Sequence, residues 1–399
     1  MLLGVGPDGP LRSRRVAITG LGVVSCCGIG VDAFFEGLLA PAPTGERRVA
    51  DFDPTVWFGP KDVRRVDRFA QFSVAAAEMA MADAGDLQAD PDRAGVVMGT
   101  GVGGFETLQE QVTVFNERGA RRVSPFLVPM MMPNAGAATV SMRSGFRGPC
   151  ETVVTACAAG THALAAAARL VASGRLDVAI GGGAEAAMTE VGIAAFTNMT
   201  ALSASGSSRP FDARRDGFVI AEGAAALVLE DMEHALRRNA VIHAEILGAA
   251  STADAHHITA PAPGGSGAAA CMELALADAE IAPAEIGHIN AHGTSTPLND
   301  LAEAQAIEKV FGTPGPPVTS IKGVTGHALG GAGALEAVAT VLSIRRALIP
   351  PTAGYEEPDP EIHLDIVHGG PRRWEPAAAL SNSFGFGGHN GCLVIAPVR

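Results

Sequence analysis

A short run of β-branched residues passes directly into a long run of small apolar residues near the middle of the chain. Residues Glu151 to Thr155 predict a buried strand, and the alanine-rich run from Ala158 to Ala172 predicts a buried helix. Cys157 stands at the joint between them. The unpaired N–H groups and aligned peptide dipoles of a helix N-terminus favour negative charge, so we expect this thiol to ionise easily and to act as a nucleophile. The alternative is that Cys157 is one more small buried apolar residue.

Strand-like and helix-like segments alternate along the rest of the chain, which predicts an α/β protein with mostly parallel sheets covered by helices. The pattern starts again near residue 244, so we expect a loose tail at 1–13 and two similar halves at 14–243 and 244–399. The expected helices include Asp32–Leu39 with Asp32 as its cap, Arg68–Ala84 ended by Gly85, a polar helix to about Arg118, Gly265–Ala279, Leu298–Phe311 and Gly330–Arg346. The expected strands include Ala94–Met98, Asp177–Gly181, Ala221–Glu230, Ala244–Gly248, His288–Asn290, Val318–Ile321, Ala378–Ser381 and Cys392–Ala396.

The charge and the cysteines exclude several classes of function. A formal net charge of −13 argues against general nucleic-acid binding, since phosphate backbones need a positive surface. The six cysteines show no CxxC pair and no regular spacing, so neither a metal site nor a disulfide framework is expected, and we predict reduced thiols in a cytoplasmic protein. No run of about 18 apolar residues predicts a membrane span, and no signal peptide is expected at the N-terminus.

Three stretches of the second half place polar residues among glycines or apolar residues. They are His288-Ile-Asn-Ala-His292-Gly-Thr294-Ser-Thr296, Ser320-Ile-Lys322-Gly-Val-Thr-Gly-His327 and Ser381-Asn-Ser-Phe-Gly-Phe386-Gly-Gly388. His292 and His327 each follow a strand-like segment, and sites in open α/β sheets lie at the carboxyl ends of strands. Either histidine alone fits a structural role. Two histidines, a lysine and a cysteine at a strand end together favour a catalytic site.

Taken together with Thr-Ala-Cys157, these stretches resemble the β-ketoacyl-[acyl carrier protein] synthases, in particular the elongating type II condensing enzymes of fatty acid synthesis. The resemblance runs from about Arg15 to Val394 and keeps the order of the motifs. It implies the thiolase fold, in which duplicated βαβαβαββ halves form five layers, α-β-α-β-α. It also implies a homodimer whose substrates are malonyl and acyl thioesters on the phosphopantetheine of an acyl carrier protein, with no further cofactor.

The resemblance also implies roles for individual residues. Cys157 would carry the acyl chain, while His292 and His327 would donate N–H groups to an enolate. The N–H groups of Cys157 and Phe386 would hold a second oxyanion, and Phe386 would gate the acyl pocket. Lys322 would order the histidines, with Glu336 and Asp300 as supporting residues. Thr294 and Thr296 would bind the pantetheine, and Leu108 would line the acyl pocket. The carrier protein would dock on five arginines, namely Arg64, Arg65, Arg68, Arg121 and Arg122.

Simpler interpretations of these positions remain open. The threonines could serve only to form a turn, Leu108 could be an ordinary core residue, and the lysine and arginines could be solvated surface charges. Three departures from the family pattern leave chain-length preference and the tuning of Cys157 open. They are Ala158-Ala159 after the cysteine, Gly323 after the lysine, and His389 after the glycine-rich loop.

Other classes of function fit less well. The run Gly99-x-Gly101-x-x-Gly104 matches a dinucleotide-binding pattern, but no acidic residue ends a second strand about 20 residues later. A thiolase usually needs a second cysteine, a noncatalytic chain-length-factor-like partner lacks the nucleophile, and an initiating synthase carries Cys-His-Asn. A ketosynthase of a type II polyketide or specialised lipid pathway would share every catalytic residue, so the sequence leaves it open.

Overall fold

The structure, a computed structural model, describes residues 14–399. The predicted tail at 1–13 lies outside the described residues. Eleven strands form one sheet in the order β4-β3-β5-β6-β1-β7-β13-β12-β8-β9, with β2 paired to β1. Those of the first half are β1 (Val16–Ser25), β2 (Gly28–Ile29), β3 (Ala94–Gly99), β4 (Cys150–Val153), β5 (Val178–Glu185) and β6 (Gly223–Asp231). Those of the second half are β7 (Ala244–Ala253), β8 (Ile286–Asn290), β9 (Val318–Thr319), β12 (Ala378–Gly385) and β13 (His389–Ala396). A second, two-stranded sheet consists of β10 (Leu348–Ile349) and β11 (Arg372–Arg373).

The strand order is the same in both halves. β1 and β7, the first long strand of each half, meet at the centre in an antiparallel pair. Outward from them, β6, β5, β3 and β4 on one side correspond to β13, β12, β8 and β9 on the other. This correspondence supports the predicted division at residues 243 and 244, which we keep as a proposal.

The expectation of mostly parallel sheets is wrong. Only the outer pairs are parallel, namely β4 with β3, β3 with β5, β12 with β8, and β8 with β9. The pairs nearer the centre are antiparallel. For β12 and β13 the reason is local, because the short connection between them can only reverse the chain. The alternation of strands and helices does not reveal such reversals.

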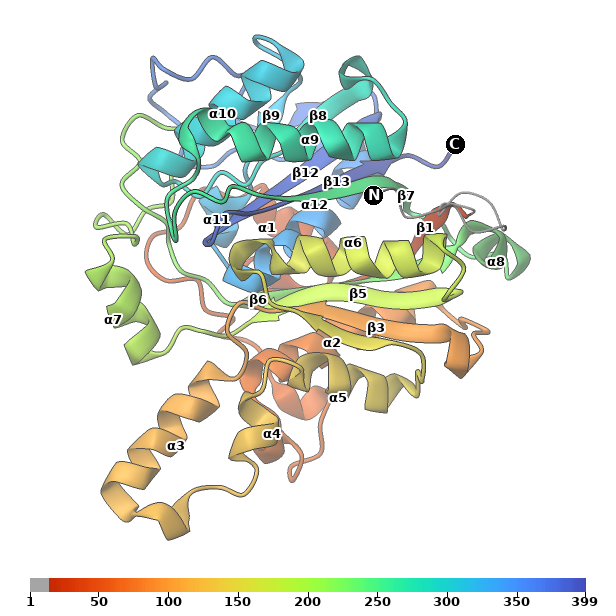
Figure 1. Ribbon diagram of the computed structural model, residues 1–399, viewed down its shortest axis with the longest axis vertical. Helices are drawn as coiled ribbons and strands as arrows, with labels where there is room; N and C mark the ends of the chain where they lie inside the picture. The colour runs from red at the N-terminus through yellow and green to blue at the C-terminus, as the bar shows by residue number, and fades with distance from the viewer. Residues whose placement is uncertain (1–13) are drawn as a thin grey trace.

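Helices form three layers around the two halves of the sheet (Figure 1). α6 (Ala159–Ala172) and α12 (Ala332–Arg346) lie between the halves, α2 (Arg68–Ala84) and α5 (Ala135–Ser144) cover the first, and α9 (Ser266–Ala279) and α10 (Pro297–Phe311) lie outside the second. Alanine is frequent on α6, and such small side chains let the two sheet halves approach the central layer closely. The predicted five-layer, duplicated α/β architecture is confirmed. The other helices are α1 (Val31–Leu38), α3 (Phe105–Arg118), α4 (Leu127–Met131), α7 (Glu190–Asn198), α8 (Met232–Arg237) and α11 (Lys322–Thr325).

Local predictions differ in how well they match. The helix at Arg68–Ala84 is observed as predicted, and Gly85 ends it with a φ of 74°. The predicted cap at Asp32 is wrong, because α1 begins at Val31 and Gly30 occupies the cap position. The predicted strand at 151–155 is not buried, since β4 lies at the edge of the sheet with Cys150 and Glu151 exposed. Among residues 14–399, no helix has both the length and the apolar character needed to cross a membrane.

Candidate active site

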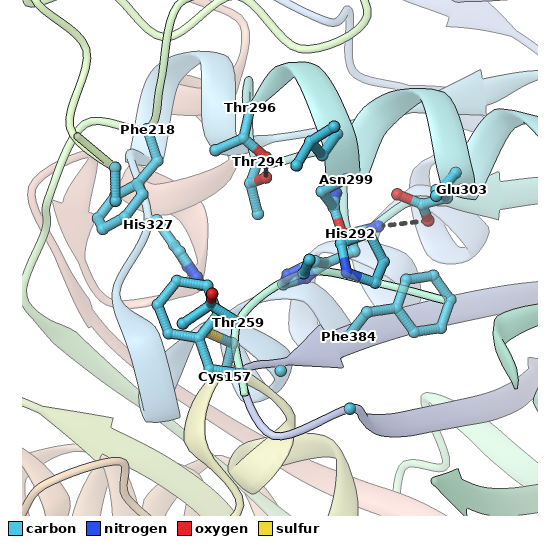
Figure 2. Close-up of a pocket in the computed structure, with 18 of the residues that line it drawn as sticks. Cys157, Phe218, Thr259, His292, Thr294, Thr296, Asn299, Glu303, His327 and Phe384 are labelled. Carbon is cyan, nitrogen blue, oxygen red and sulfur yellow. Dashed lines mark hydrogen bonds between the residues drawn. The ribbon is translucent and has the colours of Figure 1, made fainter. Parts of the chain in front are cut away.

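A cavity of about 370 Å³ lies between the two halves, and six of the residues singled out in the sequence line it (Figure 2). The first half contributes Cys157 and Phe218. The second half contributes His292, Thr294, Thr296, His327, Phe384 and Phe386. Five segments that lie far apart in the chain therefore meet around one volume.

A sharp turn presents Cys157 to this cavity. Ala156 has a φ of 49°, a left-handed conformation that costs a residue with a side chain about 1–2 kcal/mol. Cys157 follows in a single 3₁₀ turn (Ala156–Ala158) that leads into α6. Gly385 packs beside this turn, and a side-chain carbon there would lie 3.1 Å from the Cys157 backbone nitrogen. The turn and the glycine together allow the 385–388 loop to approach the sulfur.

The sulfur and the two imidazoles lie within contact range of one another. One ligand atom from each of Cys157, His292 and His327 lies within 4.8 Å of the other two. The imidazole rings of the two histidines are 5.4 Å apart between centroids and nearly perpendicular, at 82°. Figure 2 shows both rings and the sulfur facing the same space. The structure therefore brings together the three groups that the resemblance requires.

The expectation that Cys157 ionises easily is wrong for the unliganded site. Burial raises the pKa of Cys157 to about 11, although the Lys322 ammonium and a hydrogen bond from the Phe386 N–H act in the opposite direction. The nearby Glu185 carboxylate adds to the rise. The sequence indicated the helix N-terminus but not the loss of water around the sulfur, which has the larger effect.

The rate at which iodoacetamide alkylates Cys157 is therefore expected to keep rising with pH through the neutral range. Below the pKa, the thiolate fraction grows about tenfold per pH unit, and only the thiolate reacts. Mass-spectrometric rates for the Cys157 peptide check this, with the exposed Cys150 as an internal reference. A plateau near pH 7 would show that the thiol is already ionised there.

Lys322 is buried, with 1% of its surface exposed, and it connects His292 to the core. Its ammonium forms an ion pair with Glu336 and donates to the His292 carbonyl oxygen at 2.5 Å. It also lies 3.4 Å from Nδ1 of His292. Burial raises the pKa of Glu336 and Lys322 opposes that rise, while Ser383 donates a hydrogen bond to the carboxylate at 3.4 Å. These contacts fit the ordering role that the resemblance implies for Lys322 and Glu336, which stays a prediction, while burial excludes the solvated-surface alternative for Lys322.

The contact between Lys322 and Nδ1 of His292 decides what the site can bind. An ammonium facing Nδ1 of His292 requires a lone pair on that nitrogen, so the ring proton lies on Nε2, which faces the cavity. The pKa of His292 is well below 6.5 because of burial, with Lys322 and His327 adding to the effect, and burial and Lys322 also lower the pKa of His327. A thiol and two imidazoles could in principle hold a metal ion. Here Nε2 of His292 carries a proton rather than a free lone pair, so the site favours an anionic oxygen.

Two buried glutamates support the site, and the sequence interpretation missed both. Glu303 on α10 accepts hydrogen bonds from the N–H groups of His292 and Gly293, at 2.8 and 2.7 Å (Figure 2). Glu185 at the end of β5 accepts from the N–H groups of Gly101 and Gly330, at 2.6 and 3.1 Å. Burial raises the pKa of each to about 7. Asp300 and Glu303 lie three residues apart on one helix face, which was the only signal in the sequence for Glu303.

The remaining predicted residues fall into two groups. Thr294 and Thr296 line the cavity, with hydroxyl oxygens 2.9 Å apart, and Asp300 is buried behind them, where it accepts hydrogen bonds from Phe211 and Ser295 N–H groups. Leu108 does not line the cavity, and its role in an acyl pocket stays a prediction. Cys157 belongs to an apolar cluster with Ala187, Met188, Phe218, Ile220 and Leu329, against which Phe105, Ile193, Phe196, Ala201 and Leu202 pack. Phe218 and Leu329 of this cluster also line the cavity.

The five arginines do not behave alike. Arg64, Arg65, Arg121 and Arg122 are exposed. The Arg65 guanidinium lies 4.9 Å from the centre of the Phe126 ring, so the first arginine pair contacts the segment that follows Arg121 and Arg122 in the chain. Arg68 is instead held by Glu222 through an ion pair of 2.7 Å and stacks on Phe72, so its charge is already partnered.

Comparisons with known proteins agree with this geometry. A family model described as the β-ketoacyl synthase N-terminal domain matches residues 41–235, and one described as the β-ketoacyl synthase C-terminal domain matches 243–356. A 3-oxoacyl-[acyl-carrier-protein] synthase 2 of Synechocystis sp. is 43% identical, with 95% of this chain and 97% of the relative covered. A protein of the same name from Coxiella burnetii is 42% identical, covering 97% of this chain and 100% of the relative.

Solved structures give the same picture. The ishigamide ketosynthase/chain length factor superposes with a TM-score of 0.91 at 34% identity, covering 97% of this chain and 100% of the other. A type II polyketide ketosynthase solved in complex with its acyl carrier protein has a TM-score of 0.88 at 32% identity, covering 96% and 100%.

Proposed function

Because this chain belongs to the β-ketoacyl synthase family, we propose that its cavity joins an acyl group held on Cys157 to malonyl-[acyl carrier protein]. The product is 3-oxoacyl-[acyl carrier protein], the elongation step of fatty acid synthesis. The chain is thus an acyltransferase of the condensing type, and its substrates arrive on phosphopantetheine without a separate cofactor. The proposal rests on the placement of the Cys157 sulfur and the two imidazoles around one cavity.

The first half-reaction loads the enzyme. The Cys157 sulfur attacks the carbonyl carbon of an acyl thioester, and the oxyanion that forms accepts hydrogen bonds from the N–H groups of Cys157 and Phe386. The carbon–sulfur bond to the carrier then breaks. The proton from the Cys157 thiol ends on the departing pantetheine sulfur, which balances the step. The hydrogen bond between the Phe386 N–H and the sulfur supports this assignment.

The second half-reaction forms the new carbon–carbon bond. Malonyl-carrier protein loses carbon dioxide, and the electron pair of the broken bond becomes an enolate. Neutral His292 and His327 donate N–H groups to the enolate oxygen, which stabilises it by a few kcal/mol per donor. The enolate carbon attacks the acyl-Cys157 carbonyl, the sulfur leaves, and one proton taken up from solvent restores the thiol. Thr294 and Thr296 would hold the pantetheine arm.

Replacing His292 with alanine tests this division of labour. Decarboxylation of malonyl-carrier protein is expected to fall by about 10²–10³-fold, because one donor to the enolate oxygen is lost. Transfer of an acyl group to Cys157 should fall much less, since that step uses backbone N–H groups. Release of labelled carbon dioxide and acylation of the protein measure the two steps separately. Equal loss of both would contradict the proposed role.

The carrier protein is proposed to dock where the two exposed arginine pairs meet. Carrier proteins are acidic, and this chain, although negative overall, gathers positive charge there. Phe126 and Val128, at 39% and 60% exposed, supply apolar surface between the arginines. The solved complex of a related ketosynthase with its carrier protein supports a partner of this kind.

Changing Arg64, Arg65, Arg121 and Arg122 to glutamate is expected to raise KM for carrier-bound substrate, because the new charges repel an acidic partner. KM for a short pantetheine thioester without the carrier should not change. A matched variant with four arginines that are exposed elsewhere, Arg175, Arg237, Arg373 and Arg399, changed to glutamate controls for net charge. Equal KM values in the two variants would remove the docking proposal.

The pathway, assembly and compartment complete the proposal. Structural similarity to type II polyketide ketosynthases favours such a pathway as the second candidate, but the curated relatives of higher identity are synthases named for 3-oxoacyl products. The exposed edge strand β4, next to Cys157, supports a homodimer in which this edge meets its copy. Six cysteines without a disulfide among them support a reducing cytoplasmic setting.

A further inference from the structure

Two adjacent cysteines outside the cavity lie with their sulfurs in contact. Cys26 and Cys27 occupy the turn between β1 and β2, and their Sγ atoms are 3.9 Å apart. Both side chains are partly exposed. Of the other cysteines, Cys271 and Cys392 are fully buried, whereas Cys150 and Cys157 have no thiol near them in the described contacts. Cys26 and Cys27 are therefore the one accessible thiol pair in residues 14–399.

The surroundings of this pair favour a thiolate. The hydrogen bond between the two thiols, followed by the charge of Arg47, lowers the pKa of Cys26. The same hydrogen bond, followed by burial, raises the pKa of Cys27. Arg47 is itself buried and donates at 3.1 Å to the carbonyl oxygen of Val324. One sulfur of the pair is thus prepared as a nucleophile and the other as its proton-bearing neighbour.

The spacing of the sulfurs favours a bridging atom over a direct bond. Neighbouring Cα atoms lie about 3.8 Å apart, closer than the roughly 4.4–6.8 Å usual for a disulfide, so a bond between these cysteines would be strained. Two sulfurs bound to one pyramidal arsenic atom at about 2.3 Å, with an angle near 90–100° between the bonds, lie roughly 3.3–3.5 Å apart. The observed 3.9 Å is within about half an ångström of that spacing, so a small rotation of the side chains brings both sulfurs onto one atom.

The pair also contacts the loop that carries His327. The Cys26 sulfur lies 3.5 Å from the carbonyl oxygen of Thr325. Gly326 follows with a φ of 66°, packed so closely that an added side-chain carbon would lie 2.7 Å from Arg47. His327 comes next, and its N–H donates to Val219 at 2.8 Å. Cys26 and Arg47 therefore support this loop on the side away from the cavity.

We propose that Cys26 and Cys27 form a dithiol site for trivalent arsenicals, and that occupancy displaces the loop that carries His327. With phenylarsine oxide, the arsenic–oxygen double bond breaks and two arsenic–sulfur bonds form. The two thiol protons leave with the oxygen as one water, and no atom changes its oxidation state. To reach one arsenic atom, the Cys26 sulfur must turn away from the Thr325 carbonyl, which removes one support of the loop.

Mass spectrometry of the full-length protein treated with phenylarsine oxide tests the binding. We expect one arsenical on the peptide that contains both cysteines, removal by a small dithiol, and no adduct in either Cys26→Ser or Cys27→Ser. Using both variants protects the test against one of them failing to fold. Cys150→Ser and Cys157→Ser should keep the adduct. An adduct that maps to Cys157, or that survives in both serine variants, would overturn the proposal.

Condensing activity tests the coupling to His327. The expected loss of activity rests on the proposed function, whereas formation of the adduct does not, so the binding and the loss of activity can fail separately. The arsenical is expected to abolish activity in proportion to the labelled fraction, and a dithiol should restore it. Cys27→Ser removes one sulfur of the pair but leaves the contact between Cys26 and the Thr325 carbonyl oxygen in place, so it should start with full activity and keep it during treatment. A fully labelled protein with unchanged activity would overturn the coupling.

Discussion

Replacing Cys157 with alanine is expected to lower the rate of condensation by on the order of 10⁴-fold or more. Within residues 14–399, Cys157 is the one cysteine that lines the cavity, and its sulfur lies within contact range of both imidazoles, so its removal takes away the group that holds the acyl chain. The side chain is 7% exposed and small, and its removal should cost little stability. Formation of 3-oxoacyl-carrier protein measures the rate, and thermal unfolding verifies the fold.

The matched control is Cys150→Ala, the same change seven residues earlier. Cys150 lies on the exposed edge strand β4, away from the cavity, so this variant should condense at the rate of the unchanged protein. If Cys157→Ala condensed as fast as Cys150→Ala, the sulfur at position 157 would not be the nucleophile.

Replacing Lys322 with alanine is expected to destabilise the protein by about 3–5 kcal/mol near neutral pH, because it leaves the Glu336 carboxylate buried without its cation. Activity should fall as well, since the contact that places the His292 proton on Nε2 is lost. Urea unfolding gives the free energy. Without Lys322, nothing of like strength opposes the rise that burial causes in the folded-state pKa of Glu336. The loss of stability should therefore be small below the unfolded-state pKa of 4.5, grow as the pH rises from there toward the raised folded-state pKa, and level off above it.

A double variant separates the two effects of Lys322. Lys322→Met with Glu336→Leu replaces a buried ion pair by apolar side chains of similar size, which is often neutral for stability. We expect most of the lost stability to return while condensation stays impaired. Full recovery of activity in this variant would mean that Lys322 acts only through packing and not through His292.

The sequence predicted those parts of the fold and site that depend on local pattern. The helix at Arg68–Ala84 follows from apolar spacing and the glycine that ends it. Cys157 was recognisable because a β-branched run meets an alanine-rich run at that residue. His292, His327 and Lys322 were recognisable as polar residues among glycines. The prediction that all three lie in one site came from the family resemblance.

Other features depend on contacts between distant segments, which local pattern does not encode. Glu303 looks like any acidic residue of a helix, and only the fold places it on the N–H groups of His292 and Gly293. In the sequence, Arg68 looks like its exposed neighbours. In the fold, it binds Glu222, which lies 154 residues away in the chain. The pKa of Cys157 depends on how much water the assembled cavity excludes.

The most direct test of the central claim is the mass of the intact protein after incubation with acyl-carrier protein, before malonyl-carrier protein is added. The claim predicts one acyl group per chain, located on the Cys157 peptide, lost on addition of malonyl-carrier protein, and absent in Cys157→Ala. An acyl group on another residue, or product formation with no acyl intermediate on Cys157, would contradict it.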